Sequence, residues 1–245
     1  MICSSGIGFD PLVDGQRLTF GFEGIWQGTA VLYDHQTRSL WLHLTGLCIR
    51  GPKVGTTLTP LETGRHTTWQ EWRASHPETD VLASDPEREK GGPHGYFGRR
   101  GAASGQAYLP PTFPGTIEVD DDRLDAHALL HGVRIGDAAR AYPYAVLREQ
   151  RIVNDELGGQ PITVWFHRAS RSSAAFDRRL GTRTLSFERD EDGTIRDRET
   201  KSTWTMEGRA TAGALEGKQL ARAPGLMSEW YGWRAAHADT TIYGR

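Results

Sequence analysis

Cysteine is scarce in this sequence, which has only Cys3 and Cys48 among 245 residues. Two cysteines are too few for a disulfide scaffold, and their number does not fix the redox compartment. The chain also lacks any run of about 18 apolar residues, and its first residues show no charged segment followed by an apolar one. As written, the sequence predicts neither a membrane span nor an export signal. The localisation it indicates is cytoplasmic.

A surplus of positive charge is also missing, because 29 Lys and Arg face 31 Asp and Glu, for a net charge of −2. Such a balance argues against nucleic acid as a partner. No His-x-x-His, His-Glu-x-x-His or paired-cysteine spacing indicates zinc, so no metal or cofactor is predicted. The 37% hydrophobic and 24% charged content is that of an ordinary globular protein with room for two small domains.

An internal repeat becomes visible when the chain is slid along itself. Three groups of residues recur in the same order, with offsets that shrink from 167 to 161 and so require only two small deletions. The matched pairs are Phe9-Asp10 with Phe176-Asp177, Asp34 and Trp41 with Asp197 and Trp204, and Trp69, Trp72 and His76 with Trp230, Trp233 and His237. Chance would not preserve order, spacing and three tryptophans together.

The repeat predicts an α+β, mostly β fold made of two tandem pseudo-equivalent units, each closed by a short tryptophan-containing helix. Residues 1–83 form the first unit, whose opening segment is missing, 84–130 are a Gly/Pro-rich connection, and 131–245 form the complete second unit. Units that cannot bury their apolar faces alone usually pack against each other. We therefore expect approximate two-fold symmetry.

Short segments rich in β-branched and aromatic residues predict strands over 17–22, 30–33, 39–44, 162–166 and 183–187. A hairpin is expected around 136–137, then a helix over 145–151 and a turn at 158–159. Thr68 and Glu71 have the capping-box spacing of a helix that runs to about His76, and Ser228 would open the equivalent helix. The tryptophans of both helices, including Trp72 and Trp233, are expected to face a core.

Several short motifs together resemble the domain-of-unknown-function family 3179, over essentially the whole chain. The motifs are Ile7-Gly8-Phe9-Asp10-Pro11, Leu32-Tyr33-Asp34 with Ser39-Leu40-Trp41, Thr67-Thr68-Trp69 with His76-Pro77, Ala141-Tyr142-Pro143, Ile152-Val153-Asn154-Asp155, and Gly158-Gly159. The resemblance carries no established activity. It implies a C-x-x-C element ahead of the Gly-x-x-Phe-Asp strand, sometimes with selenocysteine, in proteins that are often exported or lipid-anchored.

Cys3 falls where the resemblance places the second cysteine of that element, which makes it the candidate redox thiol. The first member would lie directly before Met1, so we expect the protein to extend upstream by about 37 residues. Without them, Cys3 should be unpaired near an exposed terminus, beside an uncovered strand edge. Ser170 stands opposite Cys3 in the second unit, so at most one unit is redox-competent.

Asp10, Asn154 and Asp155 are secondary candidates, although turn chemistry explains each of them without catalysis. The resemblance implies a His-Glu pair ahead of Val-Asn-Asp, but this copy has Gln150-Arg151 there. Cys48 matches Ala210 and is expected in a small buried position. His76 and His237 are expected to cap or pack their helices. The glycines between 91 and 105 are expected in a loop, not a phosphate site.

Two functions of different class follow. In the first, the full-length protein is a thiol-redox protein whose Cys3 acts on a small molecule or a protein thiol at a cleft between the units. In the second, the β-rich body is a noncatalytic envelope-associated module that binds a ligand or serves a structural role. An exposed Cys3 near polar or cationic groups would favour the first, and a Cys3 packed among apolar side chains the second.

Overall fold

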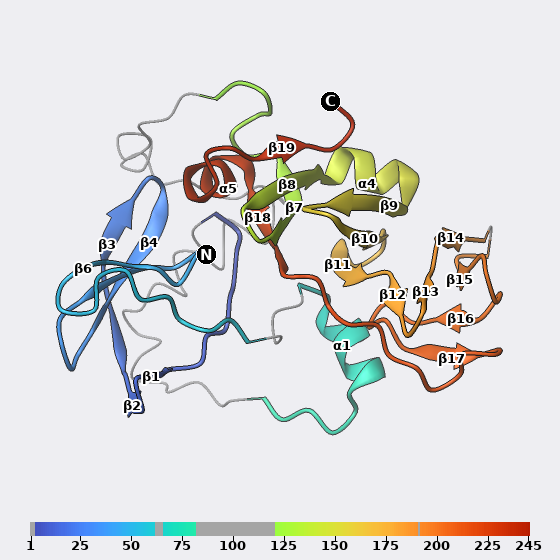
Figure 1. Cartoon of the computed structure of the whole chain (residues 1–245), viewed down its shortest axis with the longest axis horizontal. Helices are drawn as coiled ribbons and strands as arrows, with labels where there is room; N and C mark the ends of the chain where they lie inside the picture. Colours follow the sequence, from blue (N-terminus) through green and yellow to red (C-terminus); the bar gives the residue numbers. More distant parts are fainter. Residues whose placement is uncertain (1–2, 62–65, 82–120, 191) are drawn as a thin grey trace.

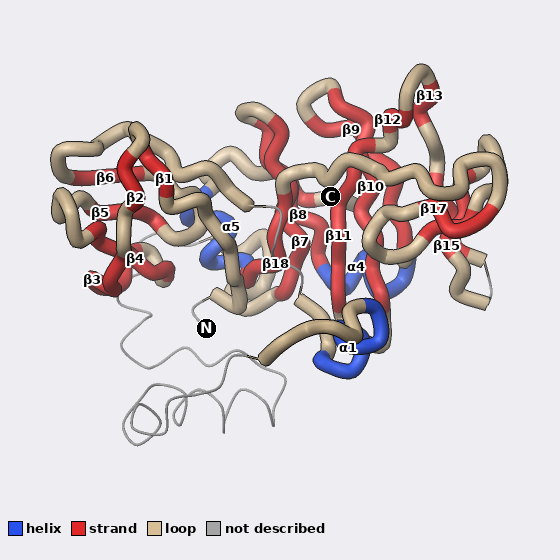
Figure 2. Tube along the Cα trace, turned by 90° about the horizontal axis from the view of Figure 1, so that it is seen from below, coloured by secondary structure: helices blue, strands red, loops and turns tan. Residues whose placement is uncertain are grey.

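The computed structural model describes residues 3–61, 66–81, 121–190 and 192–245, and strands dominate this part of the chain (Figure 1). The fold is therefore α+β and mostly β, as predicted. Most of the Gly/Pro-rich connection, including its run of glycines, lies outside the described residues. Figures 1 and 2 show one small sheet at each end of the molecule, with the larger strands of the second half between them.

The first half, residues 3–81, contains a two-stranded ribbon and a four-stranded antiparallel sheet in which neighbours in sequence pair with each other. The ribbon is β1 (Leu12–Val13) and β2 (Gln16–Arg17), the sheet is β3 (Phe20–Trp26), β4 (Thr29–Asp34), β5 (Leu40–Leu42) and β6 (Cys48–Arg50), and helix α1 spans Trp69–Ser75.

The second half, residues 121–245, contains a similar ribbon and four-stranded sheet and adds a three-stranded sheet, ordered β11-β10-β9, and a further four-stranded sheet, ordered β18-β7-β8-β19. Its elements in chain order are β7 (Leu129–Ile135), β8 (Ala138–Pro143), α4 (Tyr144–Gln150), β9 (Ile152–Leu157), β10 (Gln160–His167), β11 (Ser172–Asp177), the ribbon β12 (Arg179–Leu180) and β13 (Arg183–Thr184), the sheet β14 (Phe187–Arg189), β15 (Ile195–Asp197), β16 (Thr203–Trp204) and β17 (Ala210–Ala212), and then β18 (Gly225–Glu229), α5 (Trp230–Ala236) and β19 (Thr241–Ile242).

A fully buried aspartate organises the β4–β5 turn of the first half. The Asp34 carboxylate accepts hydrogen bonds from the backbone N–H groups of Thr37 and Ser39 and from the indole Nε1 of Trp41, at 2.9 Å. Burial alone would raise the pKa of Asp34, but the hydrogen bonds from Trp41, Thr37 and Ser39 outweigh it, and the pKa is lowered. The carboxylate thereby holds both the turn and a core tryptophan.

The same arrangement recurs in the second half around Asp197. This buried carboxylate accepts from the N–H of Thr200 at 2.6 Å and from Nε1 of Trp204 at 3.0 Å. Gly46 and Gly208 also match, because an added Cβ at either would collide with a phenylalanine ring, that of Phe9 or of Phe176. The two halves are equivalent in these contacts, whereas their origin by duplication stays a prediction.

The halves differ in how well these phenylalanines are covered. Trp165 of β10 packs on Phe176 and Phe187, which are 0% and 1% exposed. The equivalent Phe9 and Phe20 are only half-buried, and no described strand of the first half corresponds to β9 and β10.

The two tryptophan helices have similar C-terminal ends but different surroundings. In each, the second tryptophan donates to a threonine seven residues later, Trp72 to Thr79 and Trp233 to Thr240. Helix α5 buries Trp233, whereas α1 has no fully buried residue and its Trp69 is 51% exposed. The expectation that the tryptophans of both helices face a core is thus wrong for α1. Glu71 of α1 lies 3.3 Å from His167, so this helix rests beside the second half (Figure 2).

Most expected elements agree with the structure, with local exceptions. The Gly136 hairpin, the helix after Pro143 and the Gly158-Gly159 turn are confirmed, as is the Thr68 cap. The segments expected as continuous strands over 17–22 and 183–187 are interrupted after Arg17 and Thr184, where the chain passes from ribbon to sheet. Ser228 does not open α5, because it belongs to β18 and Glu229 occupies the cap.

We predict that Asp34→Ala and Asp197→Ala each lower the free energy of unfolding by about 3 kcal/mol, because each leaves several buried donors without an acceptor. Chemical denaturation followed by tryptophan fluorescence measures the loss. Asp239→Ala, at an exposed position, is the control and should change stability by less than about 0.5 kcal/mol. Equal stability of Asp34→Ala and the control variant would contradict the proposed weight of this network.

Candidate functional site

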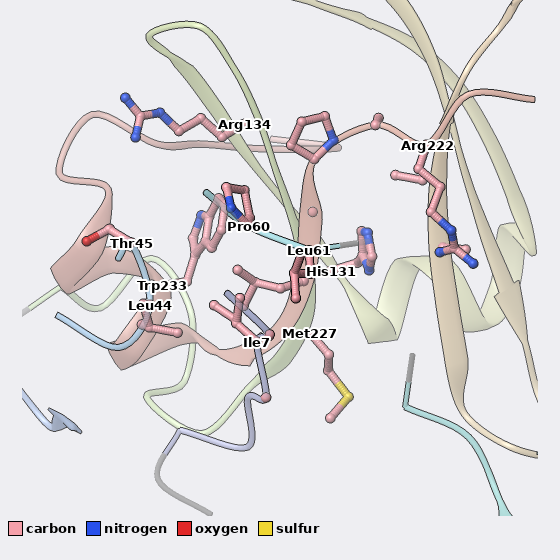
Figure 3. A pocket seen from close by; sticks show the side chains of 18 of the residues that line it. Ile7, Leu44, Thr45, Pro60, Leu61, His131, Arg134, Arg222, Met227 and Trp233 are labelled. Carbon is pink, nitrogen blue, oxygen red and sulfur yellow. The ribbon is translucent and has the colours of Figure 1, made fainter. Parts of the chain in front are cut away.

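A cavity of about 400 Å³ lies where the two halves meet (Figure 3). Its walls include residues 6–9 and 60–61 from the first half, and 173–175 and 222–227 from the second. The repeat pairs Gly6 with Ser173 and Pro60 with Arg222, so equivalent segments of the two halves face one another across it. The cavity therefore depends on the packing of one half against the other.

Apolar side chains form much of the cavity wall, among them Ile7, Leu44, Met227 and Trp233. The titratable and charged lining residues are His66, His131, Arg134, Arg222 and His237. No aspartate or glutamate is among the lining residues that the structure describes. The two arginines of the described wall are positively charged, the histidines are neutral or positive, and no described lining side chain is negative.

His131 is the most unusual of these residues, because it is only 4% exposed and one ring nitrogen has no partner. Its Nδ1 lies 2.8 Å from Oγ of Ser173, and the hydroxyl of Tyr144 lies 2.8 Å from the same oxygen. Its Nε2 makes no hydrogen bond within the described part of the chain. A buried polar atom without a partner costs free energy and requires an explanation.

Three strands bring these groups together. His131 lies in the middle of β7, where its backbone pairs with Tyr142 of β8 on one side and Met227 of β18 on the other. Ser173 comes from β11. Gly225 of β18 leaves Nε2 uncovered, since a Cβ at that position would lie 2.8 Å from it.

Burial and, to a smaller extent, repulsion by the nearby Arg222 and His66 together lower the pKa of His131 to about 3. Burial and the charge of Arg134 likewise lower the pKa of His237 to about 4. Both imidazoles are therefore neutral at neutral pH. A neutral ring has one donor and one acceptor nitrogen, which makes His131 a hydrogen-bonding group, not a cation.

Cys3 lies outside the cavity lining and is 1% exposed, packed with Leu44 and Tyr231. Its Sγ is 3.0 Å from Oγ of Ser5, and its N–H donates to the Tyr231 hydroxyl oxygen at 2.7 Å. Burial raises the pKa of the thiol to about 11 despite the hydrogen bond with Ser5, and the charge of Glu229 adds to the rise. Cys3 is unpaired, as expected, and its side chain is buried because Tyr231 of α5 packs against it; the terminus before it lies outside the described residues.

The other candidates lie apart from the cavity. Asp10 accepts from the N–H of Leu12 at 2.9 Å, as an Asx turn does. Asn154 bonds both the N–H and the C=O of Phe187, and so joins β9 to β14. Asp155 accepts from Arg140 at 2.6 Å and Tyr142 at 2.8 Å. Each has a structural partner, and a functional role for any of them stays a prediction.

The remaining predicted positions are structural. Cys48 is buried at 1% exposure in the core of the first half, and its match Ala210 is equally buried. His76 and His237 end their helices, and their rings lie 4.0 Å from those of Trp72 and Trp233. Within the described residues, no group of three or more His, Cys, Asp and Glu side chains is arranged to hold a metal ion.

Sequence reasoning missed His131, Ser173, Tyr144 and Arg222 as site residues. The one available signal was a single histidine within the apolar strand Leu129-Leu130-His131-Gly132-Val133. Such a histidine is buried together with its strand and must find a partner there. The sequence does not reveal that a cavity adjoins it, because other parts of the wall come from distant segments of the first half, between residues 6 and 66.

Fold and cavity define a mostly β protein with a partly apolar chamber between its two halves. The chain belongs to the family described as Protein of unknown function (DUF3179), whose family model matches residues 1–240. No curated protein and no solved structure gives a significant match. No helix in the described ranges is long and apolar enough to cross a membrane.

We predict that the Cys3 thiol reacts slowly with alkylating reagents in the folded protein. A pKa of about 11 leaves roughly a hundredfold less thiolate than an unperturbed thiol at the same pH, and burial hinders access further. The Cys48→Ala variant isolates the signal of Cys3, and its iodoacetamide labelling rate should rise at least about 100-fold on unfolding. Rapid labelling of the native variant would instead identify an activated thiol.

We also predict that protonation of His131 destabilises the protein in mild acid. The folded pKa of about 3 lies below the usual value of about 6.5, so the unfolded state binds the extra proton between these values. The stabilisation is complete above pH 6.5 and is lost as the pH falls toward 3, at up to about 1.4 kcal/mol per pH unit. His131→Phe should flatten the pH dependence of unfolding between pH 6 and about 4. Parallel curves for the two proteins would contradict this assignment.

Proposed function

We propose that this protein is a noncatalytic module that binds a small organic molecule in the cavity between its two halves. The observation that carries the proposal is the buried His131 ring, whose Nε2 has no hydrogen-bond partner in the described structure and belongs to the cavity wall. A ligand with a polar group would satisfy this nitrogen and remove the cost of burying it alone.

The composition and size of the cavity support the same conclusion. Binding sites for small molecules are concave, mostly apolar, and contain a few placed polar groups within roughly 300–1,000 Å³. The cavity of about 400 Å³, with Ile7, Leu44 and Trp233 in its wall and His131 as a polar group, fits this description. Its place between two equivalent halves also fits the preference of ligand sites for such junctions.

The thiol-redox function expected from the family resemblance has less support. A redox thiol reacts as a thiolate and must be reached by its substrate. Cys3 is 1% exposed and its pKa is raised to about 11 by burial, so it is a protonated thiol at neutral pH. The packing of Cys3 against Leu44 and Tyr231 supports a binding module over a redox protein.

The test uses the neutral fluorescent probe N-phenyl-1-naphthylamine, whose emission rises in apolar surroundings. The purified protein should bind the probe saturably, with one site per chain. Met227→Trp places a larger side chain in the cavity wall and should weaken binding at least about tenfold, because the probe loses its space.

Val54→Trp is the matched control, because it adds the same ring at a position that is 64% exposed and outside the cavity lining. It should bind the probe like the unmodified protein. Thermal unfolding of both variants verifies that they are folded. Non-saturable binding, or equal affinity in the two variants, would overturn the proposed function.

A further inference from the structure

The hydrogen bonds around Ser173 determine which nitrogen of His131 carries the proton. Tyr144 is 4% exposed, and within the described residues the hydrogen-bond partner of its hydroxyl is Ser173 Oγ, so the Tyr144 proton is satisfied by donation to Ser173. The Ser173 hydroxyl then donates to Nδ1 of His131. A neutral imidazole with an acceptor at Nδ1 has its proton on Nε2. His131 therefore offers an N–H donor to the cavity.

The opposite assignment leaves more groups unsatisfied. If Nδ1 of His131 donated to Ser173, the Ser173–Tyr144 hydrogen bond could use the proton of only one of the two hydroxyls, and the other hydroxyl proton would have no acceptor in the described surroundings. A buried hydroxyl proton without an acceptor costs about 1–3 kcal/mol. The relay from Tyr144 through Ser173 thus positions the ring and selects its tautomer.

The surrounding charges specify what the donor binds. Arg222 lines the same cavity, and its charge acts on His131, whose pKa it lowers. The Arg222 guanidinium lies over the Phe176 ring, at 5.5 Å from the ring centroid, and forms no ion pair with a described carboxylate, while Arg134 adds a second positive charge to the lining. Figure 3 shows His131 and Arg222 toward one side of the pocket and Ile7, Leu44 and Trp233 toward the other.

We propose that the ligand is an organic carboxylate, with its anionic group bound by Nε2–H of His131 near Arg222 and its apolar body against Ile7, Leu44 and Trp233. This inference rests on the proposed binding function and adds the chemical class of the ligand. A carboxylate is an acceptor-only group, which matches the N–H donor, and its single charge matches the unpaired guanidinium.

The inference is tested with two probes of nearly equal shape, 4-phenylbutyrate and its neutral amide, 4-phenylbutanamide. Each is titrated against the protein with bound N-phenyl-1-naphthylamine, and its affinity is obtained from displacement of the dye. The carboxylate should bind at least about tenfold more tightly than the amide, because a hydrogen bond to a charged acceptor near a cation is stronger than one to a neutral acceptor.

Three variants separate the contributions. His131→Phe keeps a ring but removes the donor, and Arg222→Met keeps much of the side-chain length but removes the charge; each should reduce the preference for the carboxylate to less than about threefold. His131→Gln retains an N–H donor and should recover part of the preference. Arg148→Met, at an exposed position on α4, removes the same charge away from the cavity and should leave both affinities unchanged.

The outcomes distinguish the two proposals. If neither probe displaces the dye and the dye itself does not bind saturably, the binding function fails. If both probes displace the dye equally in all five proteins, the binding function stands and the carboxylate inference is wrong.

A second readout does not depend on affinity. Long-range ¹H–¹⁵N NMR spectra of the unliganded protein should show His131 protonated at Nε2 and unprotonated at Nδ1, and the Nε2–H resonance should shift on addition of 4-phenylbutyrate. Ser173→Ala should alter this tautomeric preference. A ring protonated at Nδ1 would overturn the inference even if the carboxylate binds.

Discussion

The backbone of Cys3 joins the first half to the second through two hydrogen bonds, and it leads directly into a segment of the cavity wall. Its N–H donates to the Tyr231 hydroxyl oxygen, and its C=O accepts from the N–H of Glu229 at 3.0 Å. Both partners lie at the start of α5, so the first residues of the chain are tied to the second half. The segment that follows, residues 6–9, forms part of the cavity wall. The burial of Cys3 therefore has a structural reason that is independent of redox chemistry.

Each half in turn depends on a buried carboxylate that satisfies a turn and a tryptophan. Because Asp34 and Asp197 accept the same kinds of donors, the small sheets at the two ends of the molecule have the same turn and core geometry. The halves differ around them: Trp165 covers Phe176 and Phe187, and the described first half has no such cover. The large sheets of the second half also supply β7 and β11, and with them His131 and Ser173. The site is therefore asymmetric although the frame repeats.

The second half therefore supplies the polar groups of the proposed binding site. The most constrained polar group of the cavity is a neutral imidazole, which the buried hydroxyls of Ser173 and Tyr144 hold in one tautomer. Arg222 contributes a positive charge to the same wall, and no described carboxylate forms an ion pair with it. A rigid donor beside a fixed positive charge is preorganised for an anionic acceptor, since little side-chain freedom remains to be lost on binding.

Much of the frame could be predicted from the sequence, because it is local. A few neighbouring residues with known turn and capping chemistry determine each of these features: the turns at Asp34 and Asp197, the Gly136 hairpin, the helix after Pro143 and the Thr68 cap.

The burial of a side chain and the identity of its contacts are not determined locally. Trp69 and Trp72 have the same spacing as Trp230 and Trp233, yet only α5 is packed between other elements. The family resemblance places Cys3 at the second position of a C-x-x-C element, yet Tyr231 of α5 packs against it and it is buried. The site escaped prediction for the same reason: His131, Ser173 and Arg222 come from three separate segments, and only the packing of one half on the other leaves Nε2 of His131 unpartnered at a cavity. The amino-acid sequence by itself determined the repeated frame, and the tertiary structure alone decided which groups are buried, paired or free to bind.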